Sequence, residues 1–214
     1  MLFFAQFHRV CATNIGKSMK SPIRIAILAS GSGSNAENIC KYYLHRSDVE
    51  ISLIISNKFS AFVHQRAQNL GIKSITLSNS SLSDEDTFLD VLREYQIDFI
   101  ILAGYLLRIP VDVVRAFPHR IVNIHPALLP KYGGKGMYGD RVHEAVVEAG
   151  EKESGITIHF VDENYDEGSI FFQATCPVLE NETPDDVAVK VHALEYLHYP
   201  AVIDQILQQQ FYSL

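Results

Sequence analysis

Short runs of aliphatic residues recur along the first 125 residues, and segments with helical spacing of apolar side chains separate them. Continuous apolar runs of this length are typical of parallel strands that are covered on both faces. We predict strands over 23–30, 49–56, 73–77, 97–104 and 120–125. Helices are predicted between them over 36–46, 61–71, 83–96 and 111–117, the third with Ser83 as its N-cap. This alternation predicts right-handed crossovers between the strands.

The pattern changes after residue 125. A glycine-rich stretch over 126–140 is predicted as a loop, and 141–150 as a helix. Apolar and polar residues then alternate over 155–161 and 169–178. This period of two predicts an antiparallel strand pair.

A long C-terminal helix is predicted to begin at Thr183 as N-cap, with Pro184 as its first residue. Pro200 is expected to kink or split this helix, because proline lacks the amide proton. The fold class is therefore α/β: an open, mostly parallel, doubly wound sheet with an antiparallel C-terminal strand pair and a long C-terminal helix. We expect a single domain over 23–214, because no repeat or linker interrupts it.

The first 22 residues hold a short apolar patch followed by Arg9 and Lys17, with no acidic residue. We interpret 1–22 as a disordered extension or as a translation start assigned too early, and favour Met19 as the start. A transit peptide is an alternative, but the segment is poor in arginine and has no amphipathic stripe. A secretory signal is not expected, because the positive charges follow the apolar patch.

The composition limits the classes of partner. With 47% hydrophobic and 20% charged residues, the 214-residue chain is typical of a soluble globular protein. A net charge of −7 argues against a nucleic-acid partner, and no apolar run approaches ~18 residues, so no membrane partner is expected. Three widely spaced cysteines indicate reduced thiols and a cytoplasmic location. Both a monomer and a homodimer remain open.

A run of small residues, "GSGSN", follows the first predicted strand and precedes a helix. Gly31 and Gly33 allow backbone N–H groups to converge at a helix N-terminus, where a phosphate would fit. Gly31, Gly33 and Ala36 also satisfy a dinucleotide-binding pattern, but no acidic residue ends the second strand to hold a ribose. We therefore favour a monophosphate over a dinucleotide, with an ordinary tight turn as the alternative.

Asn123 and His125 lie two residues apart at the end of the fifth predicted strand, so they share one face. Functional groups of open α/β sheets gather at the carboxyl ends of strands, where the glycine loop also lies. A buried structural histidine is the alternative, but it is weakened by the neighbouring amide and the proline-bounded loop that follows. We predict a functional pair.

Four acidic residues crowd the turn between the two antiparallel strands: Asp162, Glu163, Asp166 and Glu167. The spacing of a calcium loop is absent, and a solvated hairpin turn is the default interpretation. One carboxylate could still meet His125, and would then raise the pKa of the imidazole and fix its tautomer.

Other polar residues show no clear functional pattern. His143, His192 and Glu195 lie on predicted helices, where exposed polar residues are common, and His159 alternates along a strand. No serine elbow and no metal-ligand spacing is present, so neither a covalent nucleophile nor a metal is expected.

Together these segments resemble the phosphoribosylglycinamide formyltransferase family. The resemblance lies in "IAILASGSGSNAENI", "IISNK", "ILAGYLLRIP", "VNIHPALLPKY", "GITIHFVDENYDEGSIFFQA" and "VHALEYLHYP", in this order, from about residue 23 to the end. It implies transfer of a formyl group from the co-substrate 10-formyltetrahydrofolate to the amine of glycinamide ribonucleotide in purine biosynthesis. Small-molecule substrates and no metal are implied.

The resemblance also implies roles for individual residues. The catalytic residues would be Asn123, His125 and Asp166. Ribonucleotide-binding residues would be Gly31, Ser32, Gly33, Ser34, Asn35, His192 and Glu195. Folate-binding residues would be Leu106, Leu107, Arg108, Ile109, Val161, Asp162 and Tyr165.

We expect direct attack of the amine on the formyl carbon. Asn123 and a His125 that Asp166 keeps protonated would stabilise the oxyanion, and Asp166 would accept a proton through water. Two relatives with similar cores, methionyl-tRNA formyltransferase and formyltetrahydrofolate deformylase, are alternatives. They usually carry an additional domain at the C-terminus or the N-terminus, respectively. A non-catalytic ligand sensor is a third alternative.

Overall fold

The structure is a computed structural model that describes residues 21–77 and 85–212. Within these residues, seven strands form one sheet in the order β3-β2-β1-β4-β5-β6-β7. The strands are β1 (Ile23–Leu28), β2 (Val49–Ser56), β3 (Ser74–Thr76), β4 (Phe99–Leu102), β5 (Ile121–His125), β6 (Glu153–Phe160) and β7 (Ile170–Pro177). The first five are parallel, β6 is antiparallel to β5, and β7 is antiparallel to β6. The predicted fold class is confirmed.

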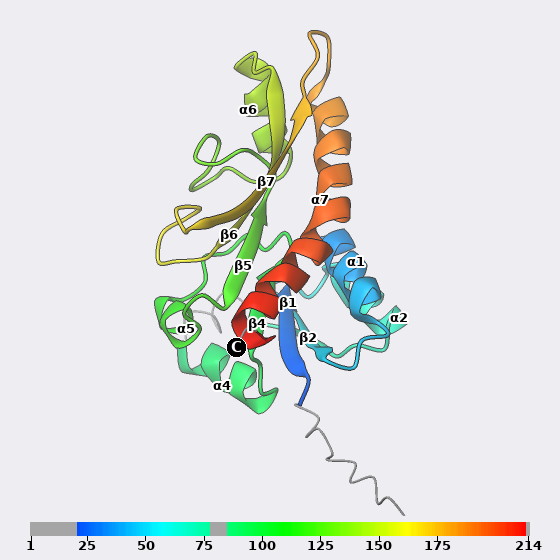
Figure 1. The fold of residues 1–214 in the computed structure, drawn as a ribbon, viewed down its shortest axis with the longest axis vertical. Coiled ribbons are helices and arrows are strands. Elements are labelled where there is room, and N and C mark those ends of the chain that lie inside the picture. The colour runs from blue at the N-terminus through cyan, green and yellow to red at the C-terminus, as the bar shows by residue number, and fades with distance from the viewer. Residues whose placement is uncertain (1–20, 78–84, 213–214) are drawn as a thin grey trace, which may run out of the picture.

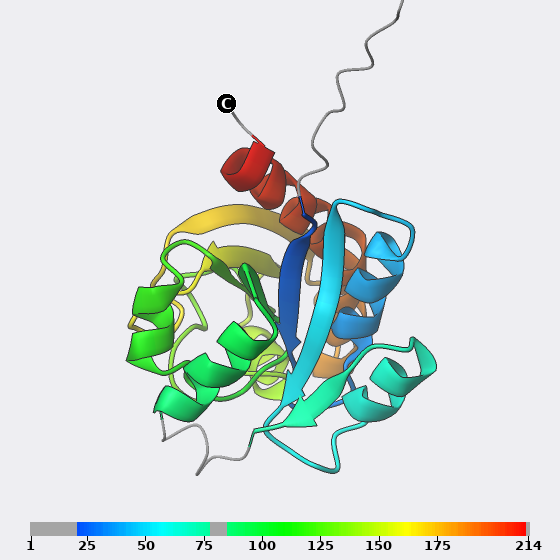
Figure 2. The ribbon, with the colours of Figure 1, turned by 90° about the horizontal axis from the view of Figure 1, so that it is seen from below.

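Helices cover both faces of this sheet (Figures 1 and 2). The helices are α1 (Ser34–Tyr43), α2 (Val63–Asn69), α4 (Glu85–Glu94), α5 (Val111–Ala116), α6 (Asp140–Glu148) and α7 (Pro184–Leu207), with a π-helix, η1 (Gln208–Tyr212), after α7. One core packs α1, α2, α6 and α7 against the sheet, and a second core packs α4 and α5 against the opposite face. The predicted N-cap Ser83 lies outside the described residues.

The chain reverses its direction of winding beside β1. It moves outward from β1 through β2 to β3, then returns to β4 on the other side of β1. The loops after β1 and β4 therefore separate at the carboxyl ends of adjacent strands, where open α/β sheets bind ligands. Two hydrogen bonds join these loops: Ser30 N donates to the Gly104 carbonyl at 3.0 Å, and Leu106 N donates to Ser30 Oγ at 2.9 Å.

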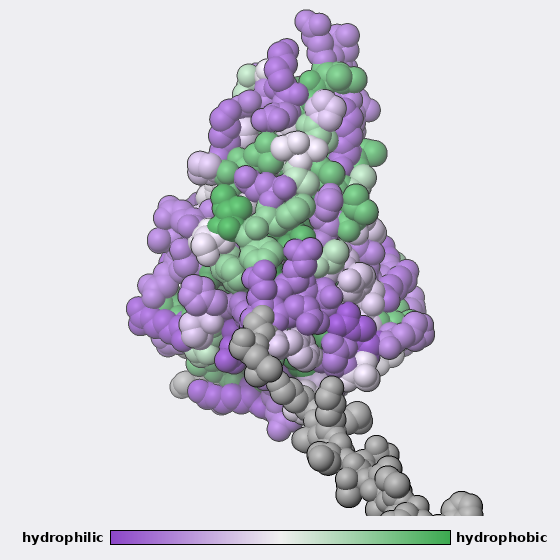
Figure 3. Space-filling view, viewed as in Figure 1, coloured by the Kyte–Doolittle hydropathy of each residue, from purple (hydrophilic) through white to green (hydrophobic). Residues whose placement is uncertain are grey.

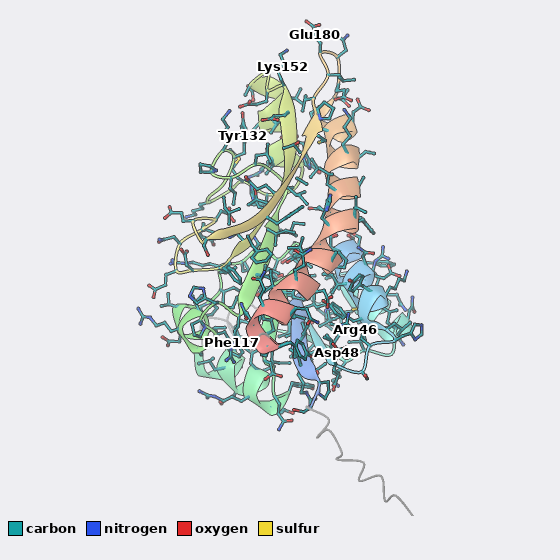
Figure 4. The ribbon with its side chains drawn as sticks, in the orientation of Figure 1. Arg46, Asp48, Phe117, Tyr132, Lys152 and Glu180 are labelled. Carbon is teal, nitrogen blue, oxygen red and sulfur yellow. The ribbon has the colours of Figure 1, made fainter. Side chains whose placement is uncertain are left out.

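The end of α7 is tied to the loop between α1 and β2 by charged side chains. Arg46 donates two hydrogen bonds of 2.7 Å to Asp48 and lies 3.1 Å from Asp204 of α7. Figure 4 labels Arg46 and Asp48 close together beside this part of α7. A bidentate guanidinium–carboxylate pair has a defined geometry, so it restrains the direction of the helix as well as its distance.

Apolar side chains are exposed along the outer part of the sheet. Figure 3 shows hydrophobic residues concentrated over β7 and α7, while the opposite end of this view is mostly hydrophilic. Exposed large apolar residues of these two elements include Ile170 of β7 and Val189 and Leu197 of α7. Because β7 is the last strand of the sheet, one of its edges has no strand partner in the described part of the chain.

Pro200 lies inside α7 without splitting it, so the prediction of a split is wrong and that of a kink holds. The helix runs continuously through Pro200, and Figure 1 shows its axis changing direction between the orange and the red parts. Proline has no N–H, so the carbonyl of Tyr196 loses its usual partner four residues later. Asn38 of α1 replaces that partner, since its Nδ2 donates to the Tyr196 carbonyl at 2.9 Å.

This replacement predicts coupling between Asn38 and Pro200. Asn38→Ala should lower the free energy of unfolding by about 0.5–1.5 kcal/mol, because the Tyr196 carbonyl loses its donor. In a Pro200→Ala background the same substitution should cost less, because the restored amide at position 200 can serve that carbonyl. Urea unfolding of the four proteins in a double-mutant cycle measures the difference. Equal costs in both backgrounds would show that the two residues act independently.

Candidate active site

A cavity of about 580 Å³ opens at the carboxyl ends of β1, β4 and β5. All of the residues that the sequence assigned to the site line it, together with additional residues of the loop before α6 and of α6 itself. The structure therefore brings together segments that lie far apart in the sequence, such as Asn35 and Glu195, which are 160 residues apart. Their individual roles remain predictions.

Asn123 and His125 project from the same face of β5, as the period of a strand requires. In the antiparallel pairing with β6, Asn123 lies opposite His159 and His125 lies opposite Thr157. Thr157 fixes the loop that follows β5, because its Oγ1 donates to the Ala127 carbonyl at 2.7 Å and accepts from Leu129 N at 3.0 Å. The turn after His125 is thus held by the neighbouring strand.

His159 orients the amide of Asn123. Its Nδ1 lies 3.0 Å from the Phe160 carbonyl, which can only accept, so this nitrogen carries a proton. In the neutral ring, Nε2 then accepts from Asn123 Nδ2 at 3.1 Å. One amide proton of Asn123 is engaged in this way, and the second is left for the cavity.

His125 and Asp166 lie within water-bridged reach of each other. His125 Nδ1 is 3.7 Å from Asp166 Oδ2, and His159 Nε2 is 3.5 Å from Asp166 Oδ1. The other nitrogen of His125, Nε2, donates to the Tyr132 carbonyl at 2.7 Å. Tyr132 lies in the loop after β5 (Figure 4). One carboxylate therefore faces two imidazoles.

The expectation that Asp166 keeps His125 protonated is wrong for this structure. Burial lowers the pKa of His125 below its ordinary value, and this effect exceeds the opposing attraction of Asp166. Only 3% of His125 is exposed, and desolvation disfavours the charged ring. His125 is therefore neutral near pH 7, with its proton on Nε2.

Asp166 adopts a left-handed backbone conformation, with φ of 56°. Its Oδ2 accepts a hydrogen bond of 2.9 Å from Gly134 N in the glycine-rich loop. Burial raises the pKa of Asp166, but the neighbouring His159 ring and the hydrogen bond from Gly134 N outweigh it, and the net pKa lies below the ordinary value. The carboxylate is thus ionised, and it holds the glycine-rich loop over the site.

The loop before α1 forms a cradle of backbone amides. Gly33 is the N-cap with φ of 72°, and no side chain caps the helix, which begins at Ser34. The first N–H groups of a helix have no partner within it, so they remain available to an anion. Arg66 supports the loop from α2, because its Nε donates to the Ser32 carbonyl at 2.9 Å.

Glu195 is a buried carboxylate at the same end of the cavity. Its Oε2 accepts from Asn35 Nδ2 and lies next to His192 Nδ1, each at 2.9 Å. The hydrogen bond with Glu195 raises the pKa of His192 above its ordinary value. Glu195 and His192 are one helical turn apart, so α7 presents both to the cavity.

The segments assigned to folate lie at the other end. Leu106 to Ile109 follow β4, and Val161 to Tyr165 follow β6. The two are joined, since Arg108 donates to the Glu163 carbonyl and its guanidinium lies 6.0 Å from the centre of the Tyr165 ring. This end combines apolar side chains with one guanidinium.

The chain is similar to known proteins in sequence and in fold. The formyl transferase family model matches residues 23–203. The chain belongs to the formyl transferase family. It is 41% identical over 193 residues to a protein named phosphoribosylglycinamide formyltransferase, chloroplastic, from Arabidopsis thaliana, covering 87% of this chain and 66% of that protein.

A bacterial relative matches along more of its own length. Phosphoribosylglycinamide formyltransferase from Haemophilus influenzae is 35% identical, covering 84% of this chain and 85% of the relative. The crystal structure of phosphoribosylglycinamide formyltransferase from Anaplasma phagocytophilum superposes with a TM-score of 0.80 at 35% identity, covering 88% of this chain and 89% of that one. The resemblance found in the sequence is confirmed for the family.

Two residues of this formyl transferase site were missed in the sequence. His159 shares a face with Thr157 at the period of a strand, the same signal that identified Asn123 and His125. His143 lies three and four residues before Val146 and Val147, so it falls on the apolar stripe of α6. Both imidazoles are almost fully buried and line the cavity.

Other kinds of site were not found. Among the residues that the structure describes, no group of three or more His, Cys, Asp or Glu side chains is placed to hold a metal ion. No helix within 21–77 and 85–212 is both long and apolar enough to cross a membrane.

Burial of neutral His125 predicts a pH-dependent stability. The unfolded chain binds a proton at His125 near the ordinary pKa of about 6.5, while the folded protein binds it only at lower pH. The stabilising contribution is therefore present above pH ~6.5 and is lost as the pH falls through the lower folded pKa. His125→Gln should flatten the fall in free energy of unfolding as the pH decreases below about 6.5.

Urea unfolding over a pH series tests this, with His45→Gln at an exposed position after α1 as the control. The slope of stability against pH is the measurement, so a general loss of stability in either variant does not affect it. A His125→Gln slope equal to that of the unsubstituted protein would contradict the assigned neutral state.

Proposed function

We propose that this protein transfers a formyl group from 10-formyltetrahydrofolate to the amine of glycinamide ribonucleotide. The observation that supports this most is the meeting of Asn123, His125 and Asp166 in one cavity beside an amide cradle. The names of the relatives at 35–41% identity agree with this activity. We infer a place in purine biosynthesis, since the acceptor is a purine precursor.

The two ends of the cavity suit two ligands. The amide cradle at Gly31 to Asn35, with Glu195 and His192, offers donors for a phosphate and acceptors for sugar hydroxyls. The segments 106–109 and 161–165 offer an apolar wall for a flat ring. A cavity of about 580 Å³ is within the usual range for small-molecule sites, and Asn123 and Asp166 line it beside both groups of residues.

Asn123 is the group best placed to stabilise the oxyanion. Attack of the amine on the formyl carbon converts its carbonyl into a tetrahedral oxyanion, which needs fixed hydrogen-bond donors. Because His159 occupies one amide proton of Asn123, the remaining proton has a defined direction. Donors that are already oriented do not have to reorganise during the reaction.

Asp166 is the proton carrier in this proposal. The ionised carboxylate accepts a proton from the attacking amine, through water, and returns it to N10 of tetrahydrofolate as the C–N bond breaks. The proton balance therefore closes without another acid. His125 is neutral before reaction, and negative charge on the oxyanion would favour its protonation at Nδ1, which faces Asp166.

The cellular compartment remains a prediction. Widely spaced cysteines favour a reducing cytoplasm, whereas the name of the Arabidopsis relative places that protein in the chloroplast. Whether the protein is a monomer or a homodimer also remains a prediction.

The activity is tested with three acceptors. The purified protein is given 10-formyltetrahydrofolate with glycinamide ribonucleotide, with charged initiator tRNA, or with water alone, and tetrahydrofolate release is followed. Only glycinamide ribonucleotide should support turnover. Rapid release with tRNA or with water would replace the proposed function with that of a tRNA formyltransferase or a deformylase.

Asn123→Ala should lower kcat by about 10²–10³ with little change in KM, because the lost hydrogen bond forms in the transition state. Steady-state kinetics measure both constants. Asn69→Ala, which removes an exposed amide of α2, is the control and should leave both unchanged. An unaltered kcat in Asn123→Ala would remove this residue from the mechanism.

Substitution of the cradle separates ligand binding from folding. A Cβ at Gly31 meets no atom within 4 Å, so Gly31→Val should fold and raise KM for the ribonucleotide about tenfold, leaving folate affinity unchanged. A Cβ at Gly33 would lie 2.3 Å from Cγ2 of Val63, so Gly33→Val should lower stability instead. Steady-state kinetics and thermal unfolding distinguish the two variants. Weaker folate binding in Gly31→Val would place the two ligands the other way round.

A further inference from the structure

His143 is a buried imidazole that forms no hydrogen bond with any of the described residues. Only 1% of this residue of α6 is exposed, and its Nδ1 has no partner. Leaving a buried polar group unpaired is unfavourable, because the group has lost its hydrogen bonds to water. A leucine would fill the same place on the apolar stripe of α6 without that cost, so packing alone does not account for a histidine here.

The surroundings of His143 belong to one end of the cavity. Its ring lies 6.3 Å from the ring of His192, in an edge-on arrangement, and it lines the cavity. Its electrostatic neighbours are His192, Glu195, Asp140 and His125. Because His192 is bonded to Glu195, His143 lies beside the residues assigned to the ribonucleotide.

A second unpaired atom lies in the same place. Asn35 donates from Nδ2 to Glu195, but its Oδ1 is buried and has no partner. Asn35 is bonded to Glu195, and His143 lies beside His192, which is also bonded to Glu195, so side chains of α1 and α6 both carry unsatisfied atoms near this carboxylate. Native proteins leave few buried polar atoms unpaired, so a cluster of them beside a cavity indicates that a ligand completes the hydrogen bonds.

We propose that His143 is a specificity-determining residue that hydrogen-bonds a hydroxyl of the bound pentose. This inference rests on the proposed function for the identity of the ligand. Glu195 accepts a hydrogen bond from one hydroxyl of the pentose, and His143 forms a hydrogen bond with the other hydroxyl.

The chemistry of the ring suits this role. Burial, and then the neighbouring His192, lowers the pKa of His143, so the ring is neutral. A neutral imidazole has one N–H donor and one acceptor nitrogen, and a hydroxyl can satisfy either. A ligand without that hydroxyl would leave the buried ring unpaired, which is how sites built for a hydroxyl reject analogues that lack it.

The test measures binding without folate. Calorimetric titration gives the Kd of glycinamide ribonucleotide, its 2′-deoxy analogue and its 3′-deoxy analogue, for the unsubstituted protein and for His143→Leu. We expect His143→Leu to bind the ribonucleotide about fivefold to tenfold more weakly. The substitution should not change the affinity for one of the two deoxy analogues, so discrimination against that analogue disappears. Discrimination against the other deoxy analogue should persist.

Two further variants separate recognition from packing. His143→Asn keeps a short polar side chain and should restore part of the discrimination. Val146→Ala alters the same helix at a buried position that does not line the cavity, and should lower stability without changing discrimination. If His143→Leu weakened all three ligands equally, or none, His143 would be a packing residue and the inference would be overturned.

The binding test of His143 and the activity assay can fail independently of each other. A protein that binds the ribonucleotide with the expected discrimination but transfers no formyl group would refute the proposed function and support the role of His143. A protein that transfers the formyl group, and whose His143→Leu variant still discriminates against both deoxy analogues, would support the proposed function and refute the role of His143. Absence of ribonucleotide binding to the unsubstituted protein would overturn both.

Discussion

The antiparallel pairing of β5 with β6 is the constraint on which the site depends. It places Asn123 opposite His159 and His125 opposite Thr157, so four polar side chains share one face at the end of the sheet. The turn after β6 then brings Asp166 back over the same face. A Cβ at Gly168 would lie 1.8 Å from the Phe160 carbonyl, so only glycine allows this turn to close. A slip of one residue in the register would turn these side chains away from the cavity.

The sheet, the two helical layers and the long last helix could be predicted because each follows from local periodicity. The positions of the glycine loop and of the pair Asn123 and His125 could also be predicted, since both follow strands that end at one edge of a parallel sheet. Pairings between distant segments could not. The bond from Asn38 to the Tyr196 carbonyl, which replaces the partner that Pro200 removes, joins residues 158 positions apart. Roles that came from family resemblance remain predictions.

The protonation state of His125 shows where residue types alone mislead. A carboxylate beside an imidazole suggests a raised pKa, and the sequence supplies both groups. The protonation state depends on how deeply the ring is buried. Asp166 lies 3.7 Å from His125 without a direct hydrogen bond, so its attraction does not offset the desolvation of a ring that is only 3% exposed. His192 gives the opposite result on α7, because it is exposed and bonded directly to Glu195 at 2.9 Å. The same pair of chemical groups is thus tuned in two directions by burial and distance.

His143 extends this reasoning from charge to hydrogen bonding. At the end of the cavity that holds Asn123 and His125, internal hydrogen bonds fix the side chains: His125 is bonded to Tyr132, His159 to Phe160 and Asn123, and Asp166 to Gly134. At the cradle end, Asn35 and His143 retain buried atoms without partners among the described residues. Satisfied groups hold their positions before a ligand arrives, which suits stabilisation of a transition state. Unsatisfied groups gain most from a ligand that completes them, which suits recognition. We therefore expect the fixed side chains Asn123, His125 and Asp166 to serve the reaction, and the unpaired atoms of Asn35 and His143 to serve recognition of the substrate.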